Sequence, residues 1–83
     1  MYWLSFVDPD RPKGSKFLGA VIAPFDDFAE ALAWTRMNHI NPGGECKGIQ
    51  FERSQLPNMT DDMIGRLLSK EFCITQMSGV PWQ

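Results

Sequence analysis

The apolar run from Phe17 to Ala23 is the segment that most constrains how this chain can fold. It holds one glycine and no charged or polar side chain. A strand-length run without alternation is typical of a strand covered on both faces, so we expect it at the centre of a sheet. The earlier segment Tyr2–Val7 is aromatic and β-rich, which predicts a second strand. With only 83 residues in the chain, we expect one small domain rather than two.

Capping and turn signals predict the elements that follow. Asp27, with Glu30 three residues later, forms a capping-box pattern for a helix that runs to about Asn38. A third strand is expected over 45–53, and Thr60 is expected to cap a short second helix. The first helix should present a core stripe at Phe28, Ala29, Leu32, Ala33 and Ile40, and the second at Met63, Ile64, Leu67 and Leu68.

These elements predict an α+β fold of order β-β-α-β-α. We expect a single domain over residues 1–83, with a three-stranded, mainly antiparallel sheet, helices on one face and an irregular tail at 74–83. One face of the apolar strand would then lack a cover, and Trp3, Trp34 and Trp82 add aromatic area beyond the core stripe. The sequence therefore predicts a homo-oligomer that buries this surplus.

Composition excludes several classes of protein. The hydrophobic fraction of 43% is too high for a disordered chain, and the formal net charge of -2 argues against a duplex nucleic-acid binder. Cys46, Cys73 and the single His39 cannot form a zinc set, so neither a metal nor a cofactor is expected. No membrane-length apolar run or signal-peptide pattern is present, which predicts a cytoplasmic protein with free thiols.

The connection from Asp8 to Lys16 is the most unusual loop in the sequence. Its nine residues exceed what a hairpin needs, and they gather Arg11, Lys13 and Lys16 although the whole chain is acidic. Such a cluster produces a local positive potential that can hold an anionic ligand. A solvated polar turn is the equally weighted alternative.

A second candidate anion site lies in the turn after the first helix. Gly43 and Gly44 can present consecutive backbone N–H groups, and Asn41 belongs to the same turn. Arg36 falls inside the apolar arc of the helix, where it could read a phosphate. The structural alternatives are an ordinary turn and an arginine that extends along the edge of the core.

Catalytic signals are weak, and we expect no enzyme and no catalytic residues. Tyr2 and Trp3 offer faces on which a base could stack. Asp8, Asp10 and Glu45 leave open an acidic or hard-metal site, and with it an uncommon hydrolase.

Four segments resemble a group of very small proteins encoded by phages, prophages and some actinobacterial genomes. They are WLSFVDPDRPKG at 3–14, FLG at 17–19, NPGGE at 41–45 and RLLS at 66–69. The resemblance implies a context of phage counter-defence, in which small proteins sequester nucleotide immune signals in the host cytoplasm. We therefore expect a phage-type protein that captures a small anionic, nucleotide-like ligand. The alternative is a protein-binding inhibitor that uses Trp34 and Trp82 to occlude a host defence enzyme.

Overall fold

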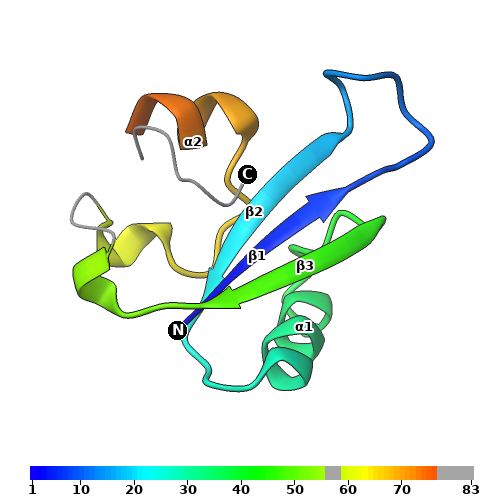
Figure 1. Ribbon diagram of the computed structural model, residues 1–83. Coiled ribbons are helices and arrows are strands. Elements are labelled where there is room, and N and C mark those ends of the chain that lie inside the picture. The colour runs from blue at the N-terminus through cyan, green and yellow to red at the C-terminus, as the bar shows by residue number, and fades with distance from the viewer. Residues whose placement is uncertain (56–58, 77–83) are drawn as a thin grey trace.

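The computed structural model describes residues 1–55 and 59–76 and confirms the predicted α+β class (Figure 1). Three strands form one antiparallel sheet, accompanied by two α-helices and two short 3-10 turns. In chain order the elements are β1 (Tyr2–Val7), β2 (Phe17–Ala23), α1 (Phe28–Met37), β3 (Glu45–Gln50), η1 (Arg53–Gln55), η2 (Asp61–Met63) and α2 (Lys70–Gln76).

The central strand is β1, not the apolar strand β2. The sheet order is β2-β1-β3, and β1 pairs antiparallel with both neighbours. The outer edge of β2 is covered by a later segment, because Ala20 and Leu68 exchange backbone hydrogen bonds and Gly65 donates to the carbonyl of Ile22. A continuous apolar run indicates that both faces of a strand are buried, but it does not show that the strand is central. An edge strand such as β2 is also buried on both faces when other segments cover it.

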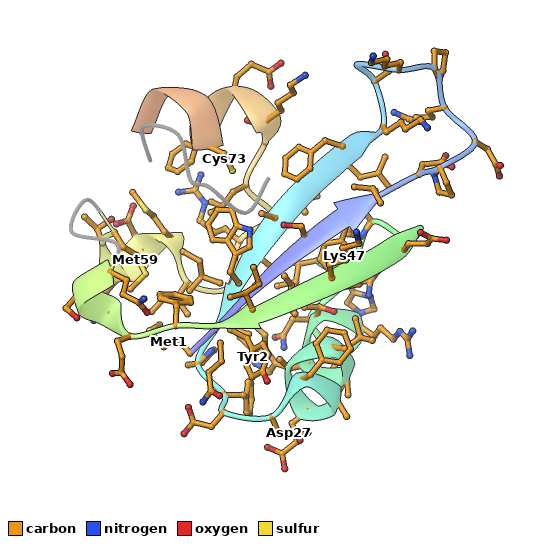
Figure 2. All side chains as sticks on the ribbon, viewed as in Figure 1. Met1, Tyr2, Asp27, Lys47, Met59 and Cys73 are labelled. Atoms are coloured by element: carbon orange, nitrogen blue, oxygen red, sulfur yellow. The ribbon has the colours of Figure 1, made fainter. Side chains whose placement is uncertain are left out.

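Both faces of the sheet are covered, which corrects the prediction of helices on one face. The α1 side buries Leu4 and Val21, whereas the other side buries Trp3 and Ile22 beneath α2 and residues 59–68. Figure 2 shows Tyr2 on the α1 side of the sheet and Cys73 on the α2 side. The uncovered face on which we based self-association is therefore absent from the described residues.

Helix α1 begins as predicted but buries only part of the expected stripe. The backbone N–H of Glu30 donates to the Asp27 carboxylate at 2.9 Å, which caps the helix. Ala31 and Thr35 are its buried residues, whereas the predicted Ala29 and Ala33 are exposed. Phe28, Leu32 and Ile40 pack on the same side, so the predicted stripe was correct for these three residues and wrong for the two alanines.

A Schellman motif ends α1 with a histidine in the position that usually holds glycine. The N–H of His39 donates to the carbonyl of Arg36, and the N–H of Ile40 donates to that of Thr35. His39 has a φ of 58° and is the one positive-φ residue other than glycine in the described chain. For a residue with a side chain this conformation costs about 1–2 kcal/mol.

The second predicted helix is replaced by a single 3-10 turn and an extended segment. Gly65 has a φ of 81°, which stops the helix after η2 and directs the chain along β2. The next helix starts where Ser69 accepts a hydrogen bond from the N–H of Phe72 at 3.1 Å. This helix, α2, runs to Gln76, so part of the tail predicted at 74–83 is helical, and residues 77–83 lie outside the described ones.

The turn between α1 and β3 uses its two glycines in different ways. A Cβ atom on Gly44 would lie 2.3 Å from the carbonyl oxygen of Val7, whereas one on Gly43 would meet no atom within 4 Å. Both have positive φ values, 88° at Gly43 and 74° at Gly44. Gly44 is therefore required by close packing on β1 as well as by its backbone conformation.

Replacing the two glycines separately tests this difference. Gly43→Ala should cost about 1–2 kcal/mol, the penalty of a positive φ alone. Gly44→Ala should cost a further ~1–3 kcal/mol because the new methyl group displaces the end of β1. Urea unfolding of both variants measures the two free energies. Equal losses would show that the contact with Val7 relaxes without cost.

Candidate functional site

The long loop and the glycine turn lie at the same end of the sheet. Val7 pairs with Phe17 across the β1–β2 side and with Glu45 across the β1–β3 side. The Asp8–Lys16 loop and the Gly43–Gly44 turn both connect to this end. The sequence left this arrangement open, and the strand register establishes it.

A register shift in the hairpin places an aromatic ring beside this loop. Phe6 pairs with Gly19 but Val7 pairs with Phe17, so Leu18 is the extra residue of a β-bulge. Paired residues share a face, and the bulge therefore moves Phe17 onto the α2 side next to Val7. Phe17 packs with the α2-side cluster and Leu18 with the α1-side cluster, as this register requires.

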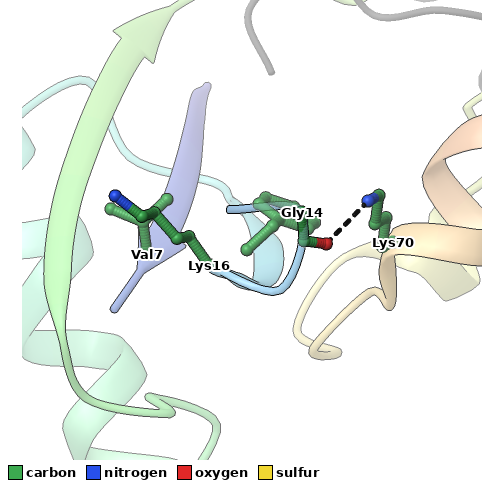
Figure 3. Close-up of a pocket in the computed structure, with 5 residues that line it drawn as sticks. Val7, Gly14, Lys16 and Lys70 are labelled. Carbon is green, nitrogen blue, oxygen red and sulfur yellow. Dashed lines mark hydrogen bonds between the residues drawn. The ribbon is translucent and has the colours of Figure 1, made fainter. Parts of the chain in front are cut away.

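The bulge forms one wall of a pocket of about 250 Å³ (Figure 3). The pocket is lined by Val7, Gly14, Lys16, Phe17 and Lys70. Its apolar walls come from the two strands, and its charged groups come from the loop and the start of α2. Figure 3 shows Lys16 alongside Val7, and Lys70 on the far side of Gly14.

Lys70 links α2 to the tip of the loop. Its Nζ donates a hydrogen bond to the carbonyl of Gly14 at 3.2 Å, which leaves two of the three ammonium protons for other acceptors. Lys16 is exposed, and neither lysine takes part in an ion pair recorded for the described residues. An apolar pocket that is lined by two lysines is suited to an anion that carries an apolar or aromatic group.

Asp8 organises the loop and uses one of its predicted cations. Its N–H donates to the carbonyl of Lys16, its carboxylate accepts from the N–H of Asp10, and the same carboxylate lies 3.6 Å from Nε of Arg11. Arg11 is therefore paired within the loop, and Lys13 is exposed outside the pocket lining. Of the three predicted phosphate-binding cations, Lys16 is the one that lines the pocket.

The aromatic residues predicted to stack a base do not reach this site. Trp3 is 0% exposed, and its Nε1 donates to the hydroxyl of Ser5 at 2.8 Å. Tyr2 lies at the opposite end of β1, about 17 Å from Val7 at the usual rise per residue. It packs edge-on against Phe28, with ring centroids 6.1 Å apart. Phe17 is the aromatic residue that lines the pocket, and its position depends on the β-bulge. No pattern in the sequence predicted that bulge.

A separate surface hollow gathers three of the predicted residues at the end of α1. Arg36, Asn41 and Gly43 line it together with His39 and Pro42. The glycines do not form a free anion-binding nest, because the N–H of Gly43 already donates to Oδ1 of Asn41 at 2.8 Å. His39, to which the sequence assigned no metal-binding or catalytic role, lies where a helix normally ends in glycine.

Other chemistry proposed from the sequence finds less support. Within residues 1–55 and 59–76, no group of three or more His, Cys, Asp or Glu side chains is arranged to hold a metal ion, and Asp8, Asp10 and Glu45 are not such a group. In the same ranges no helix is both long and apolar enough to cross a bilayer. Trp34 is half-buried against Phe25, with ring centroids 5.7 Å apart, and Trp82 lies outside the described residues.

Comparison of the chain with protein-family models, with curated proteins and with solved structures gave no match. The resemblance to small phage proteins therefore stays a prediction.

The two cysteines form no disulfide and lie on opposite sides of the sheet. Cys73 is fully buried in the α2-side cluster, and Cys46 is half-buried on the α1 side. Burial raises the pKa of Cys46 to about 11, and the Arg36 guanidinium opposes this rise.

Alkylation of Cys46 provides a test of this electrostatic arrangement. The raised pKa should keep Cys46 slow to react with iodoacetamide at pH 8, and the reaction should accelerate towards pH 11. Arg36→Ala should raise the pKa of Cys46 further and slow the reaction again.

The raised pKa of Cys46 also makes stability depend on pH. Because the folded thiol holds its proton more tightly, its contribution to stability is complete below the ordinary cysteine pKa of about 8.5. That contribution is lost as the pH rises through the folded value.

Peptide mass spectrometry separates the two cysteines, and the urea-unfolded chain supplies the reference rate. Cys46 reacting equally fast in folded and unfolded protein at pH 8 would contradict the burial.

Proposed function

We propose that this protein binds a small nucleotide-like anion in the pocket between the Asp8–Lys16 loop and α2. The observation that carries the proposal is the pairing of an apolar wall, Val7 and Phe17, with two lysines. The ring of Phe17 offers a stacking surface, a contact worth about 1–3 kcal/mol where it has been measured for nucleic-acid bases. Lys16 and Lys70 supply the charge for a phosphate.

The pocket size favours one base rather than a whole dinucleotide. Its volume of about 250 Å³ is below the roughly 300–1,000 Å³ that encloses a drug-sized ligand. A bound base would fill the apolar part, and the sugar and phosphates would extend over Lys16 and Lys70. Arg11, which also belongs to the loop, would contribute only by exchanging its Asp8 partner for the ligand.

Capture without turnover fits the absence of catalytic signals in the sequence. A phage-type protein that sequesters a nucleotide immune signal in the host cytoplasm would need affinity and abundance, not a reaction.

Self-association belongs to the same proposal, and we place it at the outer edge of β3, because β3 pairs with β1 alone among the described strands. An added strand would bond to the backbone groups along that edge. Sedimentation velocity measures this association directly, and a monomer at all concentrations would refute it.

Calorimetric titration tests the ligand class. The panel comprises cyclic dinucleotides, cyclic trinucleotides and cyclic ADP-ribose isomers, added to the 83-residue protein. Lys16→Ala and Lys70→Ala should each weaken binding by about tenfold, the loss expected for one charged hydrogen bond of ~1.5 kcal/mol. Phe17→Leu should also weaken binding, because it keeps an apolar side chain but removes the ring.

Lys13→Ala is the matched control, since Lys13 belongs to the same loop but does not line the pocket. It should change affinity by less than about twofold if only long-range charge is lost. No heat from any nucleotide, together with purified protein free of ultraviolet-absorbing ligand, would overturn the proposal. Recovery of a hydrolysed nucleotide would instead support an enzyme.

A further inference from the structure

The hollow at the end of α1 shares no lining residue with the loop pocket. It has a volume of about 460 Å³ and is formed by the last turn of the helix and the Asn41–Gly43 turn. Its charged or ionisable side chains are Arg36 and His39, and no carboxylate lines it. Any ligand held here would be recognised independently of the nucleotide pocket proposed above.

His39 occupies its position at a conformational cost, because its φ is positive. The Schellman hydrogen bonds require a positive φ at this residue, and glycine would adopt that φ without strain. The imidazole is exposed, so it does not regain the cost through core packing. Strained residues of this kind concentrate at functional sites, where the side chain is needed for something other than folding.

Asn41 is a lining residue of the hollow that is fixed by hydrogen bonds. Its Nδ2 donates to the hydroxyl of the buried Thr35 at 3.1 Å, and its Oδ1 accepts from the N–H of Gly43. Both ends of the amide are therefore used within the protein, which fixes the turn against the helix. Arg36 and His39 stand on a rigid frame, as a preformed binding site requires.

The last carbonyls of α1 do not point as free acceptors into the hollow. The carbonyls of Trp34, Thr35 and Arg36 all accept hydrogen bonds from the residues that close the helix. The guanidinium of Arg36 is exposed and enters no recorded ion pair of the described chain. Its five N–H donors form a planar fork that matches the oxygens of a phosphate.

We propose that this hollow binds a phosphate-type oxyanion, held by the guanidinium fork of Arg36 and the imidazole of His39. The ligand can be a phosphomonoester group or free inorganic phosphate, because both present the same tetrahedral oxygens. A ligand-binding role for His39 explains why a histidine with a positive φ lies at the end of α1.

Titration with inorganic phosphate, followed by amide NMR of the full chain, tests this site. Amides from Arg36 to Gly43 should shift, whereas Val7 and Phe17 should not. Arg36→Ala should weaken binding at least about tenfold, the loss of a charged hydrogen-bond pair. Arg36→Lys should give an intermediate loss, because lysine keeps the charge without the fork. Phenyl phosphate in place of inorganic phosphate shows whether a phosphomonoester is preferred.

His39→Gly provides the sharpest test because it should move two measurements in opposite directions. Relief of the positive φ should raise the melting temperature by about 4–8 °C. Loss of the imidazole should at the same time weaken phosphate binding several-fold. His39→Asn, which tolerates the same backbone conformation, separates the loss of imidazole from the change in backbone freedom.

Arg53→Ala is the control for general positive charge, since Arg53 is also exposed but pairs with Asp61 and does not line the hollow. It should leave phosphate affinity unchanged. If Arg53→Ala and Arg36→Ala weaken phosphate binding equally, the phosphate is an adventitious ion only, attracted by general positive charge. Unchanged affinity in His39→Gly would overturn the role of the imidazole. If the protein binds inorganic phosphate but none of the nucleotides, the proposed nucleotide site in the loop pocket is refuted and the phosphate site at the end of α1 is not.

Discussion

The fold depends on burying both faces of one central strand in a chain of 83 residues. Trp3 and Leu4 of β1 are both fully buried, on opposite sides of the sheet. The indole N–H of Trp3 would be costly to bury without a partner, and it donates to Ser5, two residues along the same strand face. Each side of the sheet therefore needs a cover, and the chain divides its helices between the two sides.

The two covers also position the two candidate sites. Helix α1 ends at the hollow that contains Arg36 and His39, and α2 begins at Lys70 on the wall of the loop pocket. The β-bulge at Leu18 places the ring of Phe17 on the α2 side of the sheet, because it shifts the strand register by one residue. A local irregularity in strand pairing thus determines the chemistry of a surface pocket.

Much of the fold could be predicted from the sequence, because its signals are local. The alternation in Tyr2–Val7, the apolar run of Phe17–Ala23 and the Asp27 cap each describe interactions between near neighbours. The segment after Thr60 could not be predicted in this way, since the apolar residues Ile64 and Leu68 fit a helical stripe as well as an extended one. Tertiary pairing with β2 and the positive φ of Gly65 decide between the two.

The candidate sites were harder to predict than the fold. Lys16 and Arg36 carry obvious charge and were identified, whereas Lys70 reaches the loop only through the packing of α2. Trp3 was misassigned because an aromatic residue in a strand looks the same whether its face is open or covered. The covering residues lie more than fifty positions away in the sequence, and no local pattern reports them.

The late position of that cover has a consequence for how the chain is made. Trp3, Ala20 and Ile22 belong to segments synthesised early, but Met59, Leu68 and Cys73 close over them from the end of the described chain. During synthesis the β1–β2 hairpin and α1 can therefore assemble with one sheet face still open to solvent. The α2-side core is completed only after Cys73 has been synthesised, so its final packing follows synthesis of the segment that carries α2.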